Sequence, residues 1–329
     1  MVKEIKDSKT IEFDDNHALQ TLFGPHNVNL DRMEDKLGVS IVTLGNRISI
    51  DGAIEKVRAA AEILNTLYAK AVAGGNIEIA DVDAFCRMKQ DDEPTAFISA
   101  EQDLSLHTRK RNIIPRTKGQ AEYLAAMDKF EMVFGLGPAG TGKTYLAVAK
   151  AVVMMTEGKI DRIILTRPAV EAGENLGFLP GDLKEKIDPY LRPLYDALYE
   201  MLPAETVDKK IEMGEIEIAP LAFMRGRTLN NAFVILDEAQ NTTPMQMKMF
   251  LTRLGENSRM VINGDLTQTD LPRGVQSGLF DALEVVTKID NIGIVKFSER
   301  DVVRHGLVSK IVKVYDSRQA ERKGLANAE

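Results

Sequence analysis

Eight residues in the middle of the chain have the types and the spacing needed to hold a chain of phosphates. Residues 137–144, GPAGTGKT, fit G-x-x-x-x-G-K-[ST], in which glycines let successive backbone N–H groups point at one anion. Lys143 can reach the β- and γ-phosphates, and the Thr144 hydroxyl can ligate Mg2+. The predicted nucleotide-binding residues are Gly137, Pro138, Ala139, Gly140, Thr141, Gly142, Lys143 and Thr144.

The sequence on either side of this loop predicts the two elements that must position it. The apolar run 132–136 predicts a strand, and YLAVAKAVVMM at 145–155 predicts a helix. The amino terminus of such a helix adds partial positive charge to an anion site. Strand, loop and helix together favour a phosphate-binding loop over a glycine-rich turn that happens to contain a lysine.

An acidic pair follows a second apolar strand. Residues 233–236 are all apolar and lead directly into Asp237-Glu238-Ala239-Gln240. Asp237 is predicted to hold the Mg2+ that Thr144 also ligates, and Glu238 to orient and deprotonate the attacking water. An Asp-Glu pair is a weak signal by itself, but it is strong in a chain that also has the phosphate-binding loop.

Three further side chains are candidates for contacts with the nucleotide. Gln120, at the start of the helix before the first strand, resembles the adenine-reading glutamine of superfamily-1 helicases. Gln268 lies in a GD-x-x-Q pattern after the strand 258–262 and resembles a helicase glutamine that senses the γ-phosphate. Arg304 lies in a helical pattern after the strand 292–297 and is expected to be an arginine finger or a sensor. Arg300 and Arg304 could equally be surface residues of that last helix.

Length and composition set limits on the class of protein. A chain of 329 residues suggests two domains, and a net charge of −7 restricts any nucleic-acid site to a local patch. Cys86 is the only cysteine, which excludes an intramolecular disulfide and favours a reducing cytoplasm. No apolar span of ~18 residues is present, so we expect no membrane helix.

The first 75 residues predict a small α+β unit with the element order strand, helix, helix, strand, strand, helix. This unit resembles a KH RNA-binding domain, which clamps a nucleic-acid backbone with a GXXG loop. Here the loop is Gly24-Pro25-His26-Asn27, with Asn27 in place of the second glycine and with no Lys or Arg. Asn tolerates the left-handed conformation that the loop requires. RNA binding and a packing or assembly role both remain open for this unit.

A basic stretch separates this unit from the phosphate-binding region. We predict a connecting segment and linker over 76–115, with a short strand at 77–79 and one more helix at 79–88. The five Lys or Arg residues at 109, 110, 111, 116 and 118 have no acid among them. One interpretation is a solvated linker, which is what a run of charge usually is. The other is a contact with RNA phosphates beside the nucleotide site. Residues 316–329 are predicted to be a polar tail.

Several longer stretches resemble the PhoH family, and within it the bacterial YbeZ type. They are GPAGTGKT, LTRPAVEAGENLGFLPGDLKEKIDPYLRPLYD, AFVILDEAQNTTPMQMKMFLTRLG and INGDLTQTDLPRG with FSERDVVRH. The resemblance covers about 116–315 and implies an α/β, RecA-like P-loop NTPase core with a parallel sheet. It also implies Mg2+-dependent ATP hydrolysis in the cytoplasm, a role in RNA metabolism or phosphate starvation, and association with a YbeY-type endoribonuclease. We find no PIN nuclease domain of the kind that some members carry.

The resemblance leaves two classes of function open. Only one RecA-like core fits between 116 and 315, so an arginine supplied in trans requires a second subunit, and head-to-tail packing closes a ring. We therefore expect a homo-oligomer, with a hexamer by analogy with other RecA-like rings. One hypothesis is an oligomeric ATPase that remodels single-stranded RNA or a ribonucleoprotein. The other is a nucleotide-gated module that recruits an endoribonuclease or a ribosome-maturation partner. A nucleotide kinase is a weaker third reading, because no second substrate pocket can be named.

Overall fold

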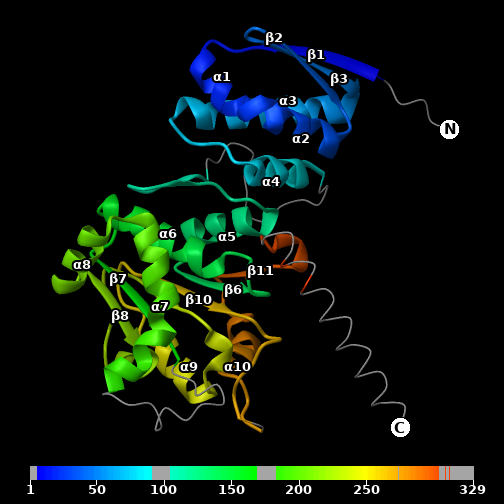
Figure 1. The fold of residues 1–329 in the computed structure, drawn as a ribbon. Coiled ribbons are helices and arrows are strands. Elements are labelled where there is room, and N and C mark those ends of the chain that lie inside the picture. The colour runs from blue at the N-terminus through cyan, green and yellow to red at the C-terminus, as the bar shows by residue number, and fades with distance from the viewer. Residues whose placement is uncertain are drawn as a thin grey trace, which may run out of the picture.

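The computed structural model describes residues 6–90, 104–168, 183–272, 274–303, 308 and 311. Figure 1 shows a small amino-terminal unit packed against a larger core that contains the phosphate-binding loop. None of the helices in these ranges is both long enough and apolar enough to span a membrane.

The amino-terminal unit is a three-stranded antiparallel sheet covered by helices. Its elements are β1 (Lys6–Glu12), α1 (Asn16–Phe23), α2 (Val28–Leu37), β2 (Ser40–Leu44), β3 (Arg47–Ala53) and α3 (Ile54–Val72). The strand order is β1-β3-β2. Ile48 and Ile50 alternate along β3 and are fully buried in one core with Leu64 of α3. The alternation along the strand therefore selects the face that the helices cover.

The turn between α1 and α2 has the backbone conformation expected of a GXXG-like loop. Gly24 ends α1 at φ 70°, and the short 3-10 helix η1 (Pro25–Asn27) follows. His26 and Asn27 have positive φ values of 55° and 63°. Asn27, in place of a second glycine, therefore adopts the left-handed conformation that Asn tolerates. Buried Asn29 fixes the turn from within, because its amide donates to the carbonyl of Leu22 at 3.0 Å.

The described parts of the predicted connecting segment, 76–90 and 104–115, contain a helix and a hairpin. Helix α4 (Ile79–Gln90) follows residue 75, and Ile77, Val82 and Cys86 are buried in the core of the amino-terminal unit. That core therefore extends past the predicted boundary at 75. Farther on, β4 (Leu106–His107) and β5 (Asn112–Ile113) form a hairpin.

The hairpin packs on the larger core instead of lying in solvent. Leu106 and Ile113 are buried in the core of the larger domain. At the turn, the Lys110 ammonium donates to the carbonyl of Tyr199 at 2.7 Å, and Arg111 pairs with Glu200 at 3.2 Å. The basic stretch contains no acidic residue, but Glu200, which is distant in the sequence, provides a carboxylate for Arg111.

The larger core is a six-stranded parallel sheet, as predicted for an α/β fold. Its order is β11-β6-β10-β9-β7-β8. The strands are β6 (Met132–Leu136), β7 (Arg162–Arg167), β8 (Ile216–Pro220), β9 (Ala232–Leu236), β10 (Arg259–Gly264) and β11 (Ile292–Lys296). The helices are α5 (Lys118–Lys129), α6 (Lys143–Thr156), α7 (Leu183–Met201), α8 (Ala204–Glu212), α9 (Pro244–Leu251) and α10 (Gly278–Val286).

Both faces of this sheet are covered, which explains why its strands are continuous apolar runs. Phe233 and Ile235 of β9 point into a core shared with α5, α6 and α7. Val234 and Leu236 point into a second core shared with α9 and α10. A parallel strand buried on both sides has no need of polar alternation. The carboxyl ends of β6, β10 and β9 lie side by side, where ligands bind in open α/β sheets.

Candidate functional site

The predicted phosphate-binding loop joins β6 to α6 and has the required backbone. Gly140 and Gly142 are left-handed, with φ values of 84° and 82°. A Cβ atom on Gly137 would lie 2.6 Å from the carbonyl oxygen of Phe297, so only glycine fits there. The Gly137 amide donates to the carbonyl of Gly264 at 3.0 Å, which ties the loop to the end of β10. The loop is therefore closely fitted between two strand ends.

Lys143 is buried inside the loop with its ammonium pointing at loop oxygens. The Nζ atom donates to the carbonyls of Gly137 at 2.7 Å and Pro138 at 2.9 Å, and lies 3.2 Å from the Thr141 hydroxyl. These oxygens offset the desolvation of the charge. A phosphate group in the loop would supply a better, anionic acceptor at the amino terminus of the 14-residue helix α6.

Thr144 and Asp237 meet as the sequence predicted. The Thr144 hydroxyl donates to Asp237 Oδ1 at 2.6 Å. Burial, together with the nearby charge of Glu238, raises the pKa of Asp237, while the Thr144 hydroxyl and Arg167 act in the opposite direction. A divalent cation between these two oxygens would offset the cost of burying the carboxylate.

The chemistry of this pair fits Mg2+, which proteins hold through one or two carboxylates together with phosphate oxygens. Two further oxygens, Thr166 Oγ1 and Asp265 Oδ2, are buried with no hydrogen-bond partner in the described parts of the chain. Within those parts, no group of three His, Cys, Asp or Glu side chains could hold a metal ion alone. The site therefore fits a metal that arrives with a nucleotide.

Glu238 is held by two side chains that the sequence analysis did not single out. Its backbone is left-handed at φ 51°, and its side chain is 38% exposed. Arg167 NH2 lies 3.3 Å from Glu238 Oε1, and Gln240 Nε2 donates to Glu238 Oε2 at 2.5 Å. The other end of the Gln240 amide accepts from the Asp265 amide at 3.0 Å. Gln240 thus links Glu238 to the loop after β10.

Gln120 lies against the phosphate-binding loop, at the third residue of α5. Its Nε2 donates to the carbonyl of Thr141 at 2.9 Å, and its Oε1 accepts from the Arg116 amide at 2.7 Å. The side chain is a bridge between the loop and the segment before α5. Both ends of its amide already have backbone partners, so the reading of adenine by Gln120 stays a prediction.

The two remaining candidates are Gln268 and Arg304, and the described residues show no contact of the Gln268 side chain with the phosphate-binding loop. Gln268 follows β10 with an exposed side chain, and its backbone amide donates to the carbonyl of Asp265 at 3.3 Å. Arg304 lies outside the described residues, as do residues 169–182 of the long family-like stretch. The γ-phosphate roles of Gln268 and Arg304 stay predictions.

Two buried contacts beside the loop were not predicted. The Tyr123 hydroxyl of α5 donates to Asn263 Oδ1 at 2.5 Å, and burial raises the pKa of Tyr123 well above its ordinary value. Asp301 Oδ1 accepts from the Gly119 amide in the first turn of α5 at 3.1 Å. Two residues later, the Val303 amide donates to the carbonyl of Gly140 at 2.9 Å. Asp301 and Val303 therefore fix residues 301–303 to the first turn of α5 and to the phosphate-binding loop.

Replacing Lys143 tests this site directly. We expect Lys143→Ala to weaken ATP binding about tenfold to a hundredfold, because hydrogen bonds to a charged group contribute about 1.5–3 kcal/mol. Isothermal titration calorimetry would measure the loss. Lys159→Ala, just after α6 and exposed to solvent, is the matched control and should bind ATP normally. Unchanged ATP affinity in Lys143→Ala would place the nucleotide elsewhere.

This chain is similar to proteins of one family over most of its length. The family model described as PhoH-like protein matches residues 112–316. A PhoH-like protein of Bacillus subtilis is 53% identical over 297 residues, which cover 90% of this chain and 93% of that protein. A PhoH-like protein of Mycobacterium tuberculosis is 48% identical over 93% of this chain and 87% of its own length. Protein PhoH of Escherichia coli is 51% identical over 62% of this chain and 58% of its own length.

Among solved structures, the SWI2/SNF2 ATPase core of Sulfolobus solfataricus, in complex with dsDNA, aligns with 54% of this chain and 42% of its own. The identity is 13% and the TM-score 0.32, which is too low to carry an argument. The extended matches to PhoH-like proteins are sufficient without it. This chain is a nucleotide-binding P-loop protein and belongs to the PhoH family.

Proposed function

We propose that this protein hydrolyses ATP with Mg2+ and couples hydrolysis to the remodelling of RNA or of a ribonucleoprotein. The observation that carries the proposal is the position of Glu238, held by Arg167 and Gln240 next to the Thr144–Asp237 pair. A carboxylate fixed beside a magnesium site is the arrangement that activates a water molecule against a γ-phosphate.

Each residue of the site has a separate task in this mechanism. The loop amides and Lys143 would bind the phosphates, and Thr144 and Asp237 would hold Mg2+, which would supply positive charge to the phosphate oxygens. Glu238 orients the water and accepts its proton, while Arg167 and Gln240 fix the direction of the carboxylate. Gln268, and Arg304 of a neighbouring subunit, are proposed to contact the γ-phosphate.

Local surface features support RNA as the substrate. The hairpin that carries Arg109, Lys110 and Arg111 lies near the phosphate-binding loop, although the whole chain is acidic. The amino-terminal unit has the element order strand, helix, helix, strand, strand, helix and a turn with two left-handed residues, and both features support the proposal of a KH-like domain. We propose that both contact single-stranded RNA in the cytoplasm, where a reduced, buried Cys86 is expected.

A second candidate is a nucleotide-gated module that recruits a protein partner such as a YbeY-type endoribonuclease. Two observations favour it. The turn at 24–27 has no Lys or Arg, and ion pairs with Glu200 and Asp81 already occupy Arg111 and Arg116. Paired cations offer less charge to RNA phosphates than free ones.

Hydrolysis itself is tested at Glu238. We expect Glu238→Gln to retain ATP binding while hydrolysis slows by ~100-fold or more, because the amide keeps the shape but cannot accept the proton. Phosphate release and calorimetry would measure the two properties separately. Glu256→Gln, on an exposed loop before β10, should behave as wild type. Normal turnover in Glu238→Gln would require a different base.

Stimulation by RNA separates the two candidates. We expect single-stranded RNA to raise the rate of ATP hydrolysis, and we expect this effect to weaken with salt as phosphate contacts are screened. The measurement is steady-state phosphate release with and without RNA over a range of salt concentrations. A basal rate that RNA does not change would favour a protein partner as the activator.

The assembly state tests whether an arginine is supplied in trans. We propose a homo-oligomer, most simply a hexameric ring, because one RecA-like core lacks the second domain that would complete the site. Light scattering in the presence of ATP and Mg2+ should give a mass of several chains. A monomer with ATP bound would contradict the ring and the trans arginine.

A further inference from the structure

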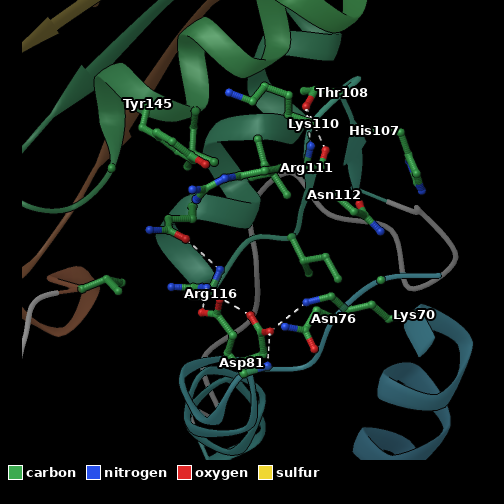
Figure 2. Close-up of a pocket in the computed structure, with 18 of the residues that line it drawn as sticks. Lys70, Asn76, Asp81, His107, Thr108, Lys110, Arg111, Asn112, Arg116 and Tyr145 are labelled. Atoms are coloured by element: carbon green, nitrogen blue, oxygen red, sulfur yellow. Dashed lines mark hydrogen bonds and ion pairs between the residues drawn. The ribbon is translucent and has the colours of Figure 1, made fainter. Parts of the chain in front are cut away.

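A cavity of about 630 Å³ lies beside the phosphate-binding loop, where the amino-terminal unit meets the core. Most of its wall comes from three parts of the chain, as Figure 2 shows, and Gln120 and Val303 complete it. The three parts are the end of α3 with the loop after it (Lys70 to Asp81), the hairpin with the strand after it (His107 to Arg116), and the edge of the phosphate-binding loop with the first turn of α6. The volume lies in the ~300–1,000 Å³ range of small-molecule sites.

The start of helix α6 presents two faces, and each has a different neighbour. Thr144 faces Asp237, at the magnesium end of the site. Tyr145 is the next residue and points about 100° away around the helix, into the cavity. Gly140 and Gly142 border the same cavity, while Lys143 points into the loop. If the phosphates of a nucleotide lie in the loop, this adjoining cavity is available for its base and ribose.

We propose that the nucleoside half of the bound nucleotide lies in this cavity, so that the amino-terminal unit and the hairpin form one wall of the nucleotide site. The proposal rests on ATP being the nucleotide of the proposed function. It adds that the core alone is an incomplete nucleotide site.

The side chains around the cavity suit a base and a ribose. The Tyr145 ring and the apolar side chain of Ile114, both partly exposed, offer surfaces for a base. An aromatic face binds a base by stacking. From the opposite side, Asn76 presents an amide that can both donate and accept hydrogen bonds.

The acids at the cavity are already neutralised, so they do not repel a nucleotide. Asp81 is buried, and its Oδ2 pairs with the Lys70 ammonium at 2.7 Å. Its Oδ1 lies 3.3 Å from Arg116 Nε, and Arg116 NH2 lies 3.3 Å from Glu78. These pairs join the amino-terminal unit to the segment before α5, at the floor of the cavity in Figure 2.

The same arginine also connects to the phosphate-binding loop. The Arg116 amide donates to Gln120, and Gln120 donates to the carbonyl of Thr141. A continuous set of bonds therefore runs from Asp81 in the amino-terminal unit to the loop, along one side of the cavity. A nucleoside held there contacts both units at once, so ATP and ADP both stabilise the contact between them.

The proposal is tested by narrowing the cavity from the amino-terminal side. We expect Asn76→Trp to weaken ATP and ADP binding about tenfold, and to leave the binding of inorganic tripolyphosphate unchanged, because tripolyphosphate needs only the loop. Val72→Trp is the matched control, since Val72 is exposed on the last turn of α3 and lies outside the cavity wall. Calorimetry on the full chain gives all the affinities.

Two results would overturn the proposal. They are wild-type affinity for ATP in Asn76→Trp, and an equal loss of ATP and tripolyphosphate binding. A wild-type chain that binds neither ATP nor ADP would overturn the proposed function itself, and with it this inference.

A second measurement needs no substitution. The unmodified full chain is irradiated with 8-azido-ATP, and the labelled peptides are mapped by mass spectrometry. Adducts within 70–81 or 107–114 are expected. Adducts confined to core residues that do not line the cavity would overturn the proposal even if Asn76→Trp failed to fold.

Discussion

The hydrogen bond between Thr144 and Asp237 joins two motifs that are 93 residues apart in the sequence. It exists because the sheet places β10 between β6 and β9, with all three carboxyl ends at one edge. A parallel sheet needs a crossover for every strand, so such neighbours are necessarily distant in sequence. The rest of the site depends on this contact. Glu238, Gln240 and the loop after β10 are placed relative to Asp237, and the phosphate-binding loop is placed relative to Thr144.

The sequence predicted the parts of the core in which local pattern and tertiary environment agree. The strand predicted at 132–136 has the observed bounds, and the strand predicted at 233–236 begins one residue early in the structure. Both are apolar runs bounded by polar or glycine residues, and both are buried on two faces. The phosphate-binding loop was predictable because its backbone conformation requires glycines at fixed positions.

What the sequence did not predict depends on contacts between distant segments. Arg167 reaches Glu238 only because β7 lies next to β9, an order that no local pattern encodes. The basic stretch was interpreted without partners because its acids, Glu78, Asp81 and Glu200, lie elsewhere in the chain. Helix α4 itself was predictable, but its packing against α2 and α3 was not, because no local signal near residue 75 shows which unit the helix joins.

The bond between Gly119 and Asp301 brings together the two ends of the core sequence. The first turn of α5 is where the core begins, and Asp301 lies just after its last strand. The first and last parts of the core sequence therefore lie next to each other in space. Neighbouring ends of this kind make circular permutation feasible. Both ends of the described core also lie beside the phosphate-binding loop, because Val303 donates to the carbonyl of Gly140 and Gly119 precedes Gln120, which donates to the carbonyl of Thr141. Domains attached at either end of the core would therefore both begin beside the phosphate-binding loop.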